Sequence, residues 1–475
     1  MSCESMLTEA PTTRSKPTSV RLKLIAWIDP ERRVLLALLG LALVLGVTYA
    51  LITPPLMGPD EDAHYEYVES LWDSGGTKVT GRASYHQPAY YWLDAPAYAL
   101  TRSQPKDVQL VVMRLVSVTF LLGEVVLAYL SAKLLAPSNR FVYLATPAIV
   151  ALLPGRGWIA GMISDDNLAS FSSSLVLYLF LRYLLHSRSR RAVAGLGASM
   201  LLAVLAKATA WPVVVVTAGA LMAMAAVHLW QRSRPFGRGL MIVALTAVMA
   251  VLVAVVVAVV GGAGEPNASS SSEAPRQEAS ALLVGLEKLM PSRLSSLMQY
   301  DWSKFLHIPP WRPEPFIHQF KTFWIPLWSD DYSAPESVYQ RALLLSVVAA
   351  AGLALSFVMT LLGARRRGIR ARQAGAVAVL VVAALLVWSA SLLQHLLMVA
   401  GTDSFNLLRV DWPPTHARYL FPALIPIAYL MAVGVGRFVP VALRTGGYAV
   451  FVAVLLYLDG EALWSIMSHA HWWTS

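Results

Sequence analysis

Residues 53–76 read TPPLMGPDEDAHYEYVESLWDSGG, and they follow directly on a long apolar run. Within a few residues this stretch presents ionisable side chains at what should be a membrane surface, namely Asp60, Glu61, Asp62, His64 and Glu66. Ionisable groups at the edge of hydrocarbon are usually paired or functional, because that environment penalises an isolated charge. The stretch therefore marks both the end of a first membrane span and a candidate functional centre.

The same stretch predicts an amphipathic helix that lies on the membrane. Ala63, Tyr67 and Leu71 fall on one helical stripe, and a Gly-Gly pair follows them as a stop signal. Asp60 is also suited to the N-cap position, where an acid favours the positive end of the helix dipole. Capping and catalysis are thus two interpretations of the acids, and we expect Asp60 or Glu61 to carry function.

The composition is typical of a polytopic all-α membrane protein. Of the 475 residues, 56% are hydrophobic and only 14% are charged, and the mean hydropathy is +0.55. Apolar runs long enough to cross a bilayer recur, which predicts about eleven spans, the fifth short enough to be partly re-entrant. The predicted spans are roughly 34–53, 111–135, 141–159, 167–185, 192–206, 211–230, 239–261, 341–362, 374–400, 419–437 and 447–467.

The basic residues predict the orientation in the membrane. With the N-terminus in the cytoplasm, 22 of the 38 Lys and Arg residues fall in inner segments, whereas 21 of the 28 acids fall in outer ones. This positive-inside bias explains the net charge of +10 as a topology signal and argues against a nucleic-acid partner. It places Asp60 on the outer face. The single cysteine, Cys3, excludes a disulfide framework and a thiolate metal site.

We divide the chain into four parts. Residues 1–33 form a basic cytoplasmic tail, and because they precede the first span we expect that span to be a signal anchor that stays in the protein. Residues 34–261 form the transmembrane core, with a first outer loop at 54–110. Residues 262–340 form a large outer loop whose first, low-complexity part we expect to be disordered. Residues 341–475 hold the C-terminal helices.

The first outer loop continues with GRASYHQPAYYWLDAPAYAL at residues 81–100. Its tyrosines, Tyr90 and Tyr91 among them, belong either to an interfacial belt or to a platform for a sugar or lipid. His86 and Gln87 add polar groups that a belt does not need. The loop is therefore a candidate substrate-binding region.

Further charged residues are predicted at the same membrane face. Asp165 and Asp166 stand where the fourth span should begin, either as a helix cap or as a second carboxylate group of a site. Lys207 and Arg418, from different spans, fit either lipid anchoring or the binding of a phosphate, and two converging cations favour phosphate. Glu124 lies within the second span, where a helix-to-helix hydrogen bond is as good an explanation as function. Asp459 and Glu461 have no assigned role.

Together these residues resemble the GT-C superfamily of integral membrane glycosyltransferases, in the branch of the protein O-mannosyltransferases and the lipid A aminoarabinose transferases. The resemblance covers about residues 34–230, and later only Arg418-Tyr419. It rests on these elements in this order: Pro59-Asp60-Glu61 with His64, Gln87 to Trp92, Asp166-Asn167-Leu168-Ala169, Lys207, and Arg418-Tyr419.

The resemblance implies a polyprenyl-phosphate-linked sugar donor, an outer-face site and inversion at the sugar carbon. Asp60 would take the proton from the hydroxyl of a glycan, lipid or protein acceptor. Asp166 would match the family's second acid, and His86 stands near where many relatives carry a Lys. A divalent metal stays open, since Asp60-Glu61-Asp62 imitates an Asp-x-Asp element. The candidate site residues are Asp60, Glu61 and Asp166 for catalysis, Lys207, Arg418 and His86 for the donor phosphate, and His64, Gln87, Tyr90, Tyr91, Asp165 and Tyr419 for substrate.

A secondary transporter or a flippase of lipid-linked sugars is the competing class. Such transporters tend to place charges near the bilayer midplane and often contain internal repeats. This sequence has no evident repeat, and apart from Glu124 its charges are predicted at one face. A non-enzymatic scaffold would not need acids and cations on a single side.

Overall fold

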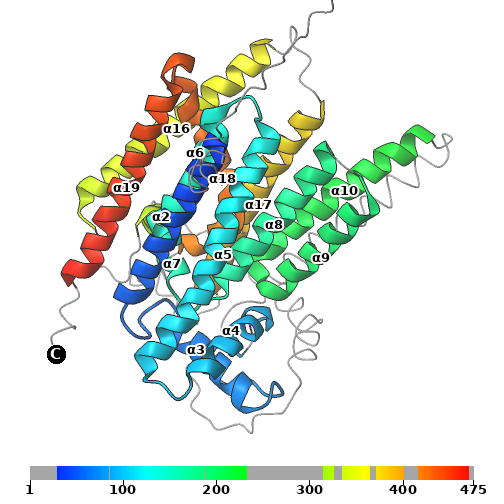
Figure 1. Cartoon of the computed structure of the whole chain (residues 1–475). Coiled ribbons are helices and arrows are strands. Elements are labelled where there is room, and N and C mark those ends of the chain that lie inside the picture. Colours follow the sequence, from blue (N-terminus) through cyan, green and yellow to red (C-terminus); the bar gives the residue numbers. More distant parts are fainter. Residues whose placement is uncertain are drawn as a thin grey trace, which may run out of the picture.

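The computed structural model describes residues 29–84, 86–186, 188–232, 314–325, 334–363, 371–400 and 416–469. In these ranges every regular element is a helix and no strand occurs (Figure 1). Among these residues, eight helices are long and apolar enough to cross a membrane, or nine spans if one bent helix pair is counted as a span. The prediction of an all-α polytopic membrane protein is confirmed, whereas the count of about eleven spans is not.

Most predicted spans correspond to one helix each. The spanning segments are α2 (Pro30–Ile52), α5 (Lys106–Leu135), α8 (Asp166–Leu185), η1 (Ala208–Ala210) with α10 (Trp211–Arg232), α16 (Glu336–Gly363), α17 (Ala371–Ala400), η3 (Ala417–Ala423) with α18 (Leu424–Phe438), and η4 (Val441–Leu443) with α19 (Arg444–His469). The predicted short fifth span is α9 (Arg190–Ala206), which has 17 residues. The predicted seventh span, 239–261, and the segment predicted to be disordered lie outside the described residues.

The predicted third span, 141–159, is broken into two helices. α6 (Arg140–Leu152) and α7 (Pro154–Ala160) meet at an angle of 53°. Leu153 between them is extended, with ψ of 112°, because a residue that precedes proline avoids the helical conformation. The break turns α7 into the bundle, where all seven of its residues are buried.

The core lies between α5, α6, α8 and α18. In the apolar stretch formed by η3 and α18, 72% of the residues are buried inside the protein. In the corresponding stretches of α16 and α19, only 17% are buried. α16 and α18 cross at very short range, since a Cβ atom added to Gly352 would lie 2.0 Å from the Gly434 carbonyl oxygen. Small residues allow helix backbones to approach in this way inside membranes. α18 and the η3 segment before it are therefore held firmly at the centre.

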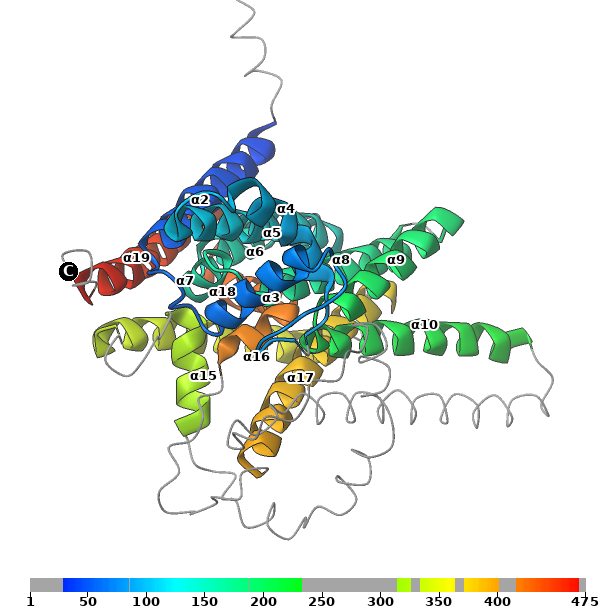
Figure 2. The ribbon, with the colours of Figure 1, turned by 90° about the horizontal axis from the view of Figure 1, so that it is seen from below.

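The segment predicted as the first outer loop forms two short helices at one end of the bundle, α3 (Glu61–Asp73) and α4 (Ala89–Thr101) (Figure 1). Seen from that end, α3 lies across the ends of the long helices (Figure 2). The rings of Tyr67 and Tyr91 stack between α3 and α4 with centroids 3.6 Å apart. A further helix, α15 (Glu314–Trp324), packs against α7 and η3. The predicted helical first loop is thus confirmed.

Candidate functional site

Asp60 lies in the turn that joins α2 to α3. Its backbone is left-handed, with φ of 59°, and it occupies the N-cap position of α3 without making a side-chain capping bond. Asp60 Oδ2 instead accepts a hydrogen bond from Arg418 Nη2 at 2.6 Å, and Oδ1 lies 3.7 Å from Arg82 Nη2. The side-chain cap proposed for Asp60 is therefore absent, and an ion pair takes its place.

Arg418 dominates the electrostatics of Asp60. Burial raises the pKa of this carboxyl, but the nearby guanidinium and its hydrogen bond outweigh burial and lower the pKa of Asp60 to about 2. The side chain keeps 40% of its surface exposed. Asp60 is therefore ionised and accessible.

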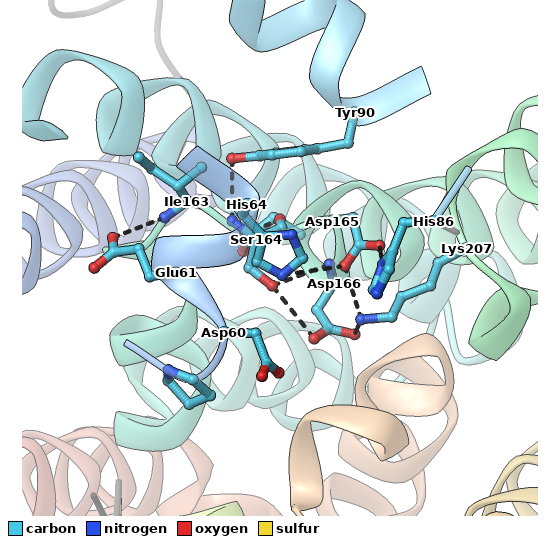
Figure 3. A network of polar contacts seen from close by, with 12 residues as sticks. Asp60, Glu61, His64, His86, Tyr90, Ile163, Ser164, Asp165, Asp166 and Lys207 are labelled. Atoms are coloured by element: carbon cyan, nitrogen blue, oxygen red, sulfur yellow. Dashed lines mark hydrogen bonds and ion pairs between the residues drawn. The ribbon is translucent and has the colours of Figure 1, made fainter. Parts of the chain in front are cut away.

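Glu61 points away from Asp60 (Figure 3) and is fully buried. Its two carboxylate oxygens accept hydrogen bonds from Arg114 Nε and Nη2, each at 2.7 Å, and Oε1 also accepts the Ile163 N–H at 3.1 Å. Arg114 binds carbonyl oxygens at the end of α2 as well, namely those of Ala50, Thr53 and Pro54. The pair ties α2, α3 and α5 together and so holds the turn that carries Asp60.

A second carboxylate group lies at the start of α8, around Lys207. Lys207 Nζ is 2.7 Å from Asp165 Oδ1 and 2.8 Å from Asp166 Oδ1, and all three residues are buried. Burial raises the pKa of Asp165, but Lys207 and His86 outweigh this and hold that pKa well below its usual range. Burial alone would lower the pKa of Lys207, yet the two carboxylates raise it above the ordinary value. Asp165 is thus charged, and it shares the ammonium group of Lys207 with Asp166.

Two histidines face Asp165 from the segment between α2 and α4 (Figure 3). His86 Nδ1 lies 2.5 Å from Asp165 Oδ2, and His64 Nε2 lies 3.8 Å from Asp165 Oδ1. The other ring nitrogen of His64 bonds to the Tyr91 hydroxyl at 2.7 Å. Burial lowers the pKa of His64 to about 3, so its imidazole is neutral. The ligand atoms of His64, His86 and Asp165 all lie within 4.8 Å of one another, and in the described part of the chain they are the one group suited to hold a metal ion.

Arg418 links the two carboxylate groups. Besides Asp60, its Nε lies 3.6 Å from Asp166 Oδ2, and Nη2 donates to the Tyr419 hydroxyl at 3.2 Å. η3 is held from both sides, because the Ala417 N–H donates to Thr322 Oγ1 of α15 and Ser170 Oγ of α8 donates to a carbonyl oxygen of η3. An unbroken chain of charge therefore runs from Asp60 through Arg418 and Asp166 to Lys207.

Glu124 and Arg156 form a fully buried pair beneath this chain. Glu124 Oε1 also accepts hydrogen bonds from Ser170 and Ser174 of α8, and Arg156 Nη1 donates to Asn167 Oδ1 at 2.7 Å. The interpretation of Glu124 as a helix-to-helix partner agrees with these contacts. The network fixes α5, α7 and α8 directly behind Asp166.

Most of the predicted site residues meet in one place. Those that converge are Asp60, His64, His86, Asp165, Asp166, Lys207, Arg418 and Tyr419. Glu61 faces Arg114 instead. Tyr90 and Tyr91 are fully buried, and Tyr90 supports the second carboxylate group because its hydroxyl accepts the Ser164 N–H at 3.1 Å. Gln87 is half-buried.

Asp94 is a buried acid that the sequence analysis did not single out. It lies in α4 with an exposed fraction of 0%, and within the described ranges neither of its carboxylate oxygens has a hydrogen-bond partner by geometry. Burial, and secondly the charge of Glu61, raise the pKa of Asp94 well above its ordinary value. The sequence does contain a signal for this burial. Asp94 lies four residues after Tyr90 and four before Tyr98, which places it on the same helix face as these aromatic residues.

Comparison with known proteins yields structural matches only. No protein-family model and no curated protein matches the sequence. The fold is similar to the oligosaccharyltransferase of Archaeoglobus fulgidus in the apo form, with 14% identity, a TM-score of 0.48, and coverage of 93% of this chain and 56% of that one. It is also similar to ArnT from Cupriavidus metallidurans bound to undecaprenyl phosphate, with 14% identity, a TM-score of 0.40, and coverage of 91% and 77%.

This chain spans about half the length of the archaeal oligosaccharyltransferase.

Proposed function

We propose that this chain is a membrane glycosyltransferase that moves a sugar from a polyprenyl-phosphate-linked donor to an acceptor hydroxyl, with inversion. The observation that carries the proposal is the charge chain Asp60–Arg418–Asp166–Lys207 at one end of the spanning helices. Glycosyl transfer needs a base at the acceptor hydroxyl and positive charge at the departing phosphate. The four residues of the charge chain supply both the base and the positive charge within one cluster.

Lys207 and Arg418 are the proposed ligands of the donor phosphate. Both are buried, and they belong to different parts of the fold, so they can contact different oxygens of one phosphate group. Each now binds carboxylates, which means that the incoming phosphate must compete with Asp60, Asp165 and Asp166. The donor phosphodiester carries one negative charge and the departing lipid phosphate gains a second, so these cations bind the phosphate more strongly as the transfer proceeds. His86 is the proposed third contact.

Donor binding then activates Asp60. When Arg418 turns to the phosphate, Asp60 loses its main charge partner and its pKa rises, because burial is no longer outweighed. Asp60 removes the proton from the acceptor hydroxyl while the acceptor oxygen forms a bond to the anomeric carbon. The bond from that carbon to the phosphate oxygen breaks on the opposite face, and its electron pair leaves with the lipid phosphate. Asp166 holds Lys207 in place during the transfer.

The remaining site residues have supporting roles in this proposal. Glu61 positions Asp60 through Arg114. Tyr90 and Tyr91 are fully buried, so they support other site residues by hydrogen bonds and do not touch the substrate. Gln87 and Tyr419 are half-buried and are the proposed contacts to the sugar or acceptor. His64 and Asp165 line the site beside Lys207.

The orientation belongs to the same proposal. The distribution of Lys and Arg supports a cytoplasmic N-terminus and a site on the outer face of the cell membrane. The acceptor is a glycan, a lipid or a protein. A transporter or flippase is less well supported, because the charge chain lies at helix ends and not at the middle of long helices. Asp60 precedes α3, Asp166 begins α8, Lys207 follows α9, and Arg418 lies in η3.

Binding of undecaprenyl phosphate to purified protein tests the proposal without knowledge of the sugar. We expect saturable binding that undecaprenol, which lacks the phosphate, does not compete away. Arg418→Ala should weaken binding by about 10- to 100-fold, since a charge-assisted hydrogen bond contributes about 1.5–3 kcal/mol. Equal binding of the phosphate and the alcohol, or an unchanged affinity in the variant, would contradict the phosphate site.

A further inference from the structure

His64 has an unusual environment for a buried side chain. Only 1% of it is exposed, and its Nε2 atom has no hydrogen-bond partner among the residues that the structure describes. That atom points towards Asp165, at 3.8 Å from Oδ1, which is too long for a hydrogen bond. A buried polar atom without a partner costs free energy, so the native structure of such a site calls for an explanation.

The surroundings of His64 fit a metal ligand. Its Nδ1 atom bonds to the Tyr91 hydroxyl at 2.7 Å, and the Tyr91 ring is in turn fixed by stacking on Tyr67. Metal-binding histidines almost always engage their second ring nitrogen in this way, because the bond sets the tautomer and the ring orientation. His64 therefore presents Nε2 in a fixed direction.

We propose that His64, His86 and Asp165 bind one divalent transition-metal ion of the Zn²⁺ class. The three residues come from separate segments, and their ligand atoms lie within 4.8 Å of one another. Ligand atoms at 2.0–2.2 Å from a zinc ion lie roughly 3.3 Å apart, so binding draws the widest pair together by at most about 1.5 Å. It also opens the His86–Asp165 contact slightly. His86, which is 14% exposed and lies in a loop, can make both adjustments.

The charges nearby allow a cation in this position. Lys207 contacts Asp165 through Oδ1, whereas His86 lies at Oδ2, so the metal and the ammonium use different oxygens. Lys207 also keeps Asp166 as a partner. Two imidazoles and one carboxylate favour Zn²⁺, Co²⁺ or Ni²⁺ over Mg²⁺ or Ca²⁺, which prefer oxygen ligands. Three protein ligands leave a fourth position open, as in zinc sites that bind water or substrate.

Cobalt titration of the full chain tests this site directly. The protein, purified without a histidine tag and treated with a chelator, is titrated with Co²⁺ while visible absorption and metal content are measured. We expect one Co²⁺ per chain with the absorption of a low-coordinate site, displaced by Zn²⁺. His86→Gln should weaken binding by at least about 100-fold, and Tyr91→Phe, which removes an outer-shell partner, by about 10- to 100-fold. His186→Gln, an exposed histidine at the end of α8, is the matched control and should bind normally.

The inference does not rest on the proposed transferase activity. Unchanged cobalt affinity in His64→Gln and His86→Gln, or binding of no more than trace metal by the wild type, overturns it. His86→Gln and Tyr91→Phe keep the test decisive if His64→Gln fails to fold. Asp60→Asn should still bind cobalt, so loss of sugar transfer with intact cobalt binding concerns the catalytic proposal alone. Full transfer by protein that binds no metal would remove the metal site and leave the transferase intact.

Discussion

Three acids in a row, Asp60, Glu61 and Asp62, should give three different results when each is replaced by its amide. Asp60→Asn should leave the free energy of unfolding within about 1 kcal/mol of the wild type, because the carboxyl is 40% exposed and caps no backbone group. Transfer of sugar from a polyprenyl-phosphate donor should fall by about 10²-fold or more, since an amide cannot accept the acceptor's proton.

Glu61→Gln should mainly destabilise the protein. The change removes the charge that faces Arg114, whose side chain is only 2% exposed. Breaking a buried ion pair on one side typically costs about 3–5 kcal/mol, because the other charge stays buried without compensation. Asp62→Asn is the matched control, since Asp62 is 55% exposed and pairs only with exposed Arg82 among the described residues. It should change neither stability nor transfer.

The assay combines two measurements on each amide variant. Reversible unfolding in mixed detergent micelles gives stability, and transfer in reconstituted liposomes, normalised to folded protein, gives activity. If Glu61→Gln lost transfer at unchanged stability while Asp60→Asn stayed active, the base would be Glu61. Full transfer in both variants would refute the acid–base mechanism, and equal stability of all three would refute the role assigned to the Arg114 pair.

Three further results are expected. Arg418→Ala should raise the donor KM by about 10- to 100-fold. Lys207→Ala should raise it to the same extent and also lower the melting temperature, because two buried carboxylates lose their shared partner. An unchanged KM in both variants would indicate that these residues only anchor the protein at the membrane interface. Burial raises the pKa of Asp94 well above the ordinary value of an aspartate, so the folded state binds its proton more tightly and wild-type stability should fall as pH rises above that ordinary value. Asp94→Asn should remove this slope in melting curves between pH 5 and pH 8, and parallel curves for both proteins would contradict it. Finally, a cysteine at position 270 should react with an impermeant reagent from outside and one at position 368 should not, and the reverse pattern would invalidate the outer-face assignment.

The convergence of charges at one end of the bundle could be predicted from the sequence. Asp60, Asp166, Lys207 and Arg418 each stand at the boundary of an apolar run, and successive boundaries alternate between the two sides of a membrane. Residues at boundaries of the same side must therefore lie at one face, although their order along the chain does not tell which pairs touch.

Other features depend on contacts that no local pattern records. Glu61 and Arg114 are 53 positions apart, and Glu124 and Arg156 are 32 positions apart. Glu61 and Asp60 are adjacent and similar in chemistry, yet one faces the protein interior and the other the site. The break before Pro154 lies within an apolar run, so hydropathy alone reads the two helices as one span.

The close crossing of α16 and α18 predicts where harmless-looking sequence variants become damaging. Neither Gly352 nor Gly434 can gain even a methyl group, because each new Cβ atom would meet backbone at about 2 Å. α18 continues directly from η3, so any widening of this crossing displaces the segment that carries Arg418. Alanine at either glycine should therefore behave in a genetic screen like a lesion of the site itself. Inactivating substitutions at such positions would report helix spacing, and would be misread as evidence for a second reactive centre.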